Sequence, residues 1–188
     1  GLLPIMRRST TYPSVRFSRT TSLYNPEEDR IFFRVNSTDH KEFRFWVTRR
    51  FAQLLLKVLG DHLVSDPDIS LQGTLADKQA VMEFKKEKAM DGANFKQSFQ
   101  EEEAEFPLGQ EAQLAYKITS NKAGDNLQLG IHPKSAQGIN MVINRDINTT
   151  MTQLLLGSAR KAGWNLGVAS RDETDTQSSG RQNDPIIN

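Results

Sequence analysis

The residues best suited to chemistry in this sequence are aromatic and basic, and they gather between residues 30 and 51. Phe32 and Arg34 lie in one alternating segment, and Arg44 and Trp46 lie in the next. Alternation with a period of two places such residues on one face of a β-sheet. Aromatic rings stack on bases and guanidinium groups pair with phosphates, so this face could bind single-stranded nucleic acid. With the two arginines that follow, the candidate residues are Phe32, Arg34, Arg44, Trp46, Arg49 and Arg50.

A purely structural interpretation of the same residues is also available. A helix or the N-terminal segment could cover Phe32 and Trp46, with the arginines lying along the rim. Arg49 and Arg50 fall at the start of a predicted helix, where the helix dipole disfavours cations. An acid such as Glu42 could compensate for them. The sequence leaves both interpretations open.

Other reactive chemistry is sparse. The absence of cysteine excludes disulfides, iron–sulfur clusters and Cys-ligated zinc. His40, His62 and His132 are far apart and have no metal-binding helical spacing. The sequence has no phosphate-binding glycine loop and no Gly-x-Ser-x-Gly motif. We therefore expect no catalytic residue, no metal site and no cofactor.

The candidate residues are positioned by a predicted β-hairpin and a helix. A polar loop over 36–41 joins the two strands. Thr48 is expected to N-cap the helix, because its hydroxyl can accept a hydrogen bond from a free amide of the first turn. The apolar residues alternate on the strands and then recur with helical spacing: Ile31, Phe33, Val35, Phe43, Phe45, Val47, Phe51, Leu55 and Leu59.

The rest of the chain supplies further elements. A helix is predicted from Thr74 to about Met90, and a last helix begins at a cap, Asp146 or Asn148. Alternating residues predict three more strands over 113–119, 127–132 and 138–144. Together these elements predict an α+β fold, with an antiparallel sheet of about five strands and helices packed on one face.

A short internal match suggests a duplication. Gln-Leu-Leu-Leu occurs at 53–56 and again at 153–156, each time after a strand and a polar cap. Two ββα units could therefore share one sheet, although chance also produces four-residue matches.

Composition sets the domain boundaries. Residues 1–29 contain four arginines and no acid before Glu27, and are predicted to form a flexible basic N-terminal arm. Residues 30–166 are predicted to form a single α+β domain, in which 93–110 are expected to be an extended connector. Residues 167–188 are rich in Ser, Gln and Asp and are predicted to be a disordered C-terminal tail.

Three segments carry a resemblance to a known group. The stretches 42–51 (EFRFWVTRRF), 106–111 (FPLGQE) and 162–165 (AGWN) resemble small bacterial proteins of unknown function. The resemblance covers about residues 30 to 166. It implies a bacterial origin and a compact α+β fold, and it brings no activity, cofactor or site residue.

The net charge of +1 gives no global field toward nucleic acid or membranes. No apolar run reaches the roughly 20 residues needed to span a bilayer, so a soluble cytoplasmic protein without a membrane partner is expected. The leading hypothesis is a non-enzymatic binding or adaptor domain that contacts a protein partner or a second copy of itself. The alternative is a single-stranded nucleic-acid-binding protein that uses the candidate residues. An enzyme of an unrecognised type is the third hypothesis.

Overall fold

The computed structural model describes residues 14–92 and 104–166, which form eight strands and four helices. Residues 1–13, 93–103 and 167–188 lie outside the described residues. They contain the beginning of the predicted arm, part of the predicted connector and the whole predicted tail. The helices are α1 (Arg49–Val64), α2 (Pro67–Ser70), α3 (Leu75–Gly92) and α4 (Arg145–Lys161). The strands are β1 (Ser14–Val15), β2 (Phe17–Asn25), β3 (Arg30–Ser37), β4 (Glu42–Val47), β5 (Gln113–Leu114), β6 (Lys117–Ala123), β7 (Asn126–His132) and β8 (Ile139–Ile143).

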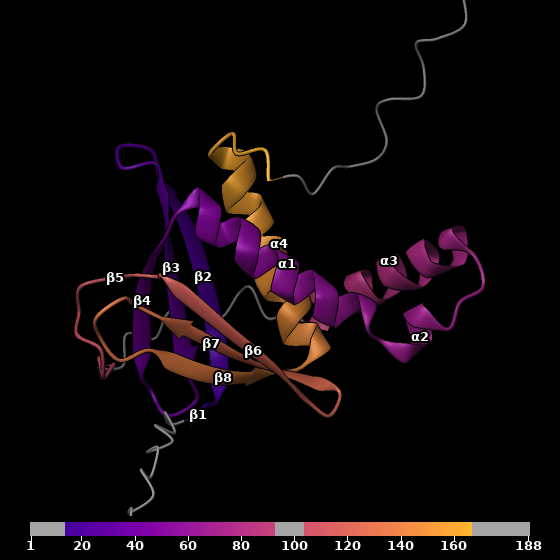
Figure 1. The fold of residues 1–188 in the computed structure, drawn as a ribbon, viewed down its shortest axis with the longest axis horizontal. Helices are drawn as coiled ribbons and strands as arrows, with labels where there is room; N and C mark the ends of the chain where they lie inside the picture. The colour runs from indigo at the N-terminus through magenta and orange to yellow at the C-terminus, as the bar shows by residue number, and fades with distance from the viewer. Residues whose placement is uncertain (1–13, 93–103, 167–188) are drawn as a thin grey trace, which may run out of the picture.

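The strands form two four-stranded sheets (Figure 1). The first sheet has the order β2-β3-β4-β5, and the second sheet has the order β1-β8-β7-β6. Neighbouring strands are antiparallel, except that β4 pairs with β5 and β1 pairs with β8 in parallel. The chain crosses between the sheets after β5. There the Ala115 N–H donates to the Trp46 carbonyl of the first sheet, and the Tyr116 N–H donates to the His132 carbonyl of the second.

One hydrophobic core joins the inner faces of both sheets to α1 and α4. Each strand turns alternate side chains inward, which gives β3 its regular alternation of buried and half-buried residues. Thr48 caps the start of helix α1, and its hydroxyl accepts the Phe51 N–H as predicted. The largest fully buried apolar side chains are Ile31, Phe33, Phe45, Leu55, Leu59, Leu129, Ile131, Met141, Ile143, Met151 and Leu155.

The architecture repeats a βββα unit, and a spacing of 96 residues relates β3 to β7 and β4 to β8 (Ile31 to Leu127). The first unit is β2-β3-β4-α1 and the second is β6-β7-β8-α4. The same spacing separates the two helix N-caps, Thr48 and Asn144. The Gln-Leu-Leu-Leu match is out of register with this repeat, since Gln53 and Gln153 are 100 residues apart.

Each unit completes the other. β1, which precedes the first unit, pairs with β8 of the second, and β5, which precedes the second unit, pairs with β4 of the first. The helices also reach across. Ser158 of α4 donates to the Ser22 carbonyl on β2, and His62 of α1 hydrogen-bonds the Asp125 carbonyl beside β7.

A buried polar network joins α1 to α4. Asn148 is fully buried, and its Nδ2 lies 2.9 Å from the Leu59 carbonyl and 2.8 Å from His62 Nδ1. The Thr152 hydroxyl donates to Asn148 Oδ1 at 3.0 Å. Since the amide nitrogen of Asn148 is a donor, His62 Nδ1 accepts, and the proton of this imidazole sits on Nε2, facing the Asp125 carbonyl at 2.9 Å. The network therefore fixes one tautomer of His62.

The predicted α+β class with mainly antiparallel pairing is confirmed, and several details differ. The expected sheet of about five strands is instead two sheets of four, and the predicted strand over 113–119 is divided between β5 and β6. Residues 14–29 of the predicted flexible arm form β1, β2 and a turn. Helix α4 is capped by Asn144 rather than by Asp146 or Asn148. In the described part of the chain, no helix combines the length and apolar character needed to cross a membrane.

Candidate functional site

A row of four apolar side chains crosses the outer face of the first sheet. Leu23 pairs with Phe32, Phe32 with Trp46, and Trp46 with Leu114 on the four successive strands. Directly paired residues point to the same side of a sheet, so these side chains form one continuous stripe, which we call the aromatic row. Leu23 is 56% exposed and Leu114 is 47% exposed, whereas Phe32 and Trp46 are half-buried.

Guanidinium groups flank the aromatic row on both sides. The Phe32 and Trp46 ring centroids are 5.3 Å apart, with the rings inclined at 60°. The Arg30 guanidinium lies 4.0 Å from the Trp46 centroid, and that of Arg34 lies 6.0 Å from the Phe32 centroid. Each cation faces the electron-rich surface of a ring, which favours this arrangement.

Glu42 holds the arginines on one flank together. Arg34 and Arg44 are directly opposite each other on β3 and β4, where like charges repel. Glu42 is 2% exposed, and its Oε1 accepts from Arg44 Nε at 2.6 Å and lies 3.8 Å from a terminal nitrogen of Arg34. Arg44 also stacks on Phe106, 4.5 Å from the ring centroid. Glu42 therefore bridges the two guanidinium groups that face each other across the strands.

Neither main helix covers the aromatic row, because both pack on the opposite face. On that face Ser22 of β2 contacts Ser158 of α4 through a hydroxyl–hydroxyl hydrogen bond of 2.7 Å. The alternative in which a helix covers Phe32 and Trp46 is therefore not what the structure shows. Among the described residues, Phe32 and Trp46 contact each other, and the Arg30 guanidinium lies over Trp46. The other predicted cover, the N-terminal segment, lies partly outside the described residues.

Four of the six predicted residues share this face, and two do not. Arg49 and Arg50 form the first turn of α1, which packs on the inner side. Arg49 donates to the Asn165 carbonyl at 3.0 Å. Glu42, which the sequence suggested as the acid that compensates for them, instead pairs with Arg44.

The second unit presents the equivalent face with different side chains. At the 96-residue spacing, the outward residues Phe32, Arg34, Arg44 and Trp46 correspond to Gln128, Gly130, Asn140 and Val142. The inward positions of β3 and β7, by contrast, are apolar and buried in both units. The second sheet therefore forms the same architecture with polar or small residues at these four positions of its outer face.

The outer face of the second sheet is closely packed around a glycine. A Cβ atom at Gly130 would collide with the side chains of Thr119, His132 and Asn140. The Thr119 hydroxyl lies 3.1 Å from His132 Nε2. Burial lowers the pKa of His132 below its ordinary value, and the nearby charge of Lys117 lowers it further. This face is therefore polar and offers no aromatic ring at the positions equivalent to Phe32 and Trp46.

Four contributors to the site were missed by sequence reasoning. Leu23 and Leu114 join the row through strand pairing between distant segments, for which the sequence has no local signal. Phe106 reaches Arg44 from the predicted connector. Arg30 could have been found, because it continues the alternation of Phe32 and Arg34 on the same strand.

Other kinds of site find little support. Across residues 14–92 and 104–166, no group of three or more His, Asp or Glu side chains is placed to hold a metal ion. Comparison of the chain with family models, with curated proteins and with solved structures finds no match. This agrees with a resemblance to proteins of unknown function. The aromatic row is the feature of the described residues that most resembles a binding site.

Proposed function

We propose that the protein is a non-enzymatic binding module whose aromatic row and flanking arginines bind single-stranded nucleic acid. The difference between the two units supports this most directly. The inward positions of β3 and β7 are mainly apolar, whereas only the first unit carries two aromatic rings beside arginines at its outward positions. The equivalent positions of the second sheet lack such residues, and a ligand that stacks on the rings would explain why they gather on one face of the first.

Base stacking would supply most of the affinity. Every base has a π-face, so stacking on Phe32 and Trp46 requires no particular sequence. Neighbouring strands lie about 4.8 Å apart, so the four-strand row spans roughly 14 Å. That length suits about two or three unstacked bases, with Leu23 and Leu114 extending the platform at its ends.

The arginines would contribute fewer phosphate contacts than their number suggests. Arg44 is hydrogen-bonded to Glu42, and Arg30 is paired with Glu28 at 2.9 Å. Each phosphate neutralised on a single strand adds about 0.7 to the slope of log affinity against log salt. One or two such contacts predict a slope of about 0.7 to 1.4, which is shallow for a nucleic-acid binder.

The test is a fluorescence-anisotropy titration of the full chain against a labelled mixed-sequence single strand at two salt concentrations. Two variants, Trp46→Val and Phe32→Gln, each replace an aromatic ring of the row. The new side chain is the one that the second unit has at the equivalent position, Val142 or Gln128. Loss of one stacked base should weaken binding by about 1–3 kcal/mol, or roughly 5- to 150-fold. The matched controls, Val142→Ala and Gln128→Ala on the second sheet, should bind like wild type.

Aromatic and arginine side chains are also enriched at protein interfaces, so the face could instead contact a protein. The titration and a protein-capture experiment with the same variants distinguish the two kinds of partner. Saturable binding that is lost in Trp46→Val and kept in the controls supports the proposal. Absence of binding at low salt, where phosphate contacts are strongest, rejects it. A host protein captured by wild type and lost in Trp46→Val would then assign the face to protein–protein contact.

A further inference from the structure

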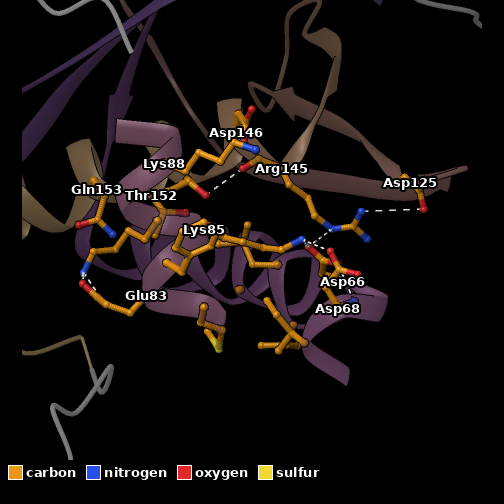
Figure 2. Close-up of a pocket in the computed structure, with 18 of the residues that line it drawn as sticks. Asp66, Asp68, Glu83, Lys85, Lys88, Asp125, Arg145, Asp146, Thr152 and Gln153 are labelled. Atoms are coloured by element: carbon orange, nitrogen blue, oxygen red, sulfur yellow. Dashed lines mark hydrogen bonds and ion pairs between the residues drawn. The ribbon is translucent and has the colours of Figure 1, made fainter. Parts of the chain in front are cut away.

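Two surfaces that could attract an anion hold cations already neutralised by carboxylates. In a cleft of about 780 Å³ among the four helices, Lys85 Nζ lies 2.6 Å from Asp66 and 2.7 Å from Asp68 (Figure 2). Beside the aromatic row, Arg44 donates to Glu42. A phosphate would have to compete with these acids, so an unpaired cation beside an exposed ring is a more favourable place for a further nucleotide contact.

The segment that crosses from the first sheet to the second carries such a ring. Tyr116 lies between β5 and β6 and is 61% exposed. Its neighbour Ala115 is buried in the core that both sheets share. Side chains of an extended chain alternate in direction, so Leu114 and Tyr116, on either side of Ala115, both project outward. Tyr116 therefore continues the aromatic row by one position beyond Leu114.

Hydrogen bonds to both sheets fix the backbone at this crossing. The Ala115 N–H donates to the Trp46 carbonyl at 2.9 Å, and the Tyr116 N–H donates to the His132 carbonyl at 2.9 Å. Leu114 pairs with Trp46, so Tyr116 lies diagonally from Trp46, and diagonal neighbours are on the order of 7–8 Å apart. This is about twice the 3.4 Å spacing along a strand of duplex DNA. Bases on both rings would therefore be unstacked from each other, as in single-strand recognition.

Two exposed lysines accompany the ring, and neither is paired with a carboxylate of the described residues. Lys134 Nζ lies 5.9 Å from the ring centroid of Tyr116, and Lys117 follows Tyr116 directly at the start of β6. Residues 112–144 contain a single acid, Asp125, in the turn at the far end of β6. This strand is about 20 Å long, so salt screens Asp125 from the lysines at its start.

We propose that a single strand bound to the aromatic row continues across the crossing, where one base stacks on Tyr116 and the phosphates beside it pair with Lys117 and Lys134. This inference rests on the proposed function and makes it more specific. The ligand is a strand longer than the two or three bases that the row itself suits. The lysines add up to about 1.4 to the slope of log affinity against log salt, because each phosphate contact contributes about 0.7.

The test compares a strand of about three nucleotides, which the row alone accommodates, with one of about eight. Binding to the full chain is followed by quenching of Trp46 fluorescence, since the other tryptophan, Trp164, is 8% exposed. Tyr116→Ala should weaken binding of the longer strand roughly 5- to 150-fold and leave the shorter strand unaffected. Tyr116→Phe keeps an aromatic ring and should bind both strands like wild type.

The lysines are tested by the salt dependence of the longer strand. Lys117→Gln and Lys134→Gln should each lower the slope by about 0.7. Lys122→Gln is the matched control, because Lys122 is also exposed on β6 and lies near the opposite end of the strand. Its slope should equal that of wild type.

The outcomes separate this inference from the function on which it rests. If wild type binds neither strand, both fall. If wild type binds the longer strand and Tyr116→Ala binds it equally well, the inference alone is overturned. Equal weakening of both strands also overturns it, because the effect then lies in the row or the fold. Circular dichroism shows whether each variant is folded. If Tyr116→Ala is unfolded, the two lysine variants decide, and an unchanged salt slope in both overturns the inference.

Discussion

Replacing Glu42 with Gln should strengthen nucleic-acid binding while it weakens the fold. The Arg44–Glu42 contact of 2.6 Å is a charge-assisted hydrogen bond, and such bonds stabilise by about 1.5–3 kcal/mol. Arg44 and Arg34 keep 26% and 21% of their side-chain surface exposed, so water offsets part of the loss. We therefore expect Glu42→Gln to lower the free energy of unfolding by about 1–2 kcal/mol.

The same substitution removes the negative charge that both guanidinium groups face. If one of them then contacts phosphate, the salt slope steepens by about 0.7, and if both do, by about 1.4. A steeper slope of 0.7 corresponds to a further two- to threefold loss of affinity between about 50 and 200 mM salt. Anisotropy titrations across a salt series measure this slope, and urea unfolding measures the stability.

Glu83→Gln is the control, because it makes the same charge change on α3, where Glu83 pairs with Lys86 at 3.0 Å. It should alter neither the slope nor the stability by a measurable amount. If folded Glu42→Gln binds with the slope and affinity of Glu83→Gln, then the arginines beside Glu42 do not meet phosphate, and the electrostatic part of the proposal is wrong.

Three further predictions concern the fold. Asn148→Ala should lower the free energy of unfolding in urea by about 2–3 kcal/mol, because His62 loses a buried partner, and an unchanged midpoint would contradict this. Hydrogen bonds, chiefly from Trp164, lower the pKa of Asp29. The ionised carboxylate therefore stabilises the fold above a pH of about 4, and this contribution is lost as the pH falls through the lowered pKa. Asp29→Asn should flatten the acid side of a midpoint-against-pH curve, and parallel curves would refute the argument. Gly130→Ala should lower the free energy of unfolding by about 1–3 kcal/mol, and with it the melting temperature, because the added Cβ would collide with its neighbours. An unchanged melting temperature would show that these neighbours move aside at little cost.

The sequence predicts the elements of this fold better than their assembly. The hairpin and helix around Trp46 are strongly patterned, because one face of each element is mainly apolar. β2 has no such pattern, since its inward residues include Thr20 and Ser22, which lie beneath α4. β1 and β5 are two residues long and form only by pairing with distant strands, so neither has a period that could be detected.

Part of the candidate site was predictable for the same reason. Alternation alone places Phe32, Arg34, Arg44 and Trp46 on one face, and the register of β3 with β4 confirms that they share it. Alternation cannot show that Leu23 and Leu114 continue the row, because their neighbours in the sheet are distant in the chain. The sequence also could not predict that Glu42 pairs with Arg44, since ion pairs depend on how side chains pack.

The exchange of β1 and β5 between the two units has a consequence for symmetry. Two separate copies of one βββα chain could associate in this way, but such a homodimer would display the same outer face twice. Joining the units in one polypeptide removes that constraint, because each face can then change by itself. The two units are alike inside, with Phe33 and Leu129 both fully buried, while Trp46 and its counterpart Val142 differ in kind. The fused chain can therefore carry a single asymmetric surface on a nearly symmetric frame, which a homodimer of one unit cannot.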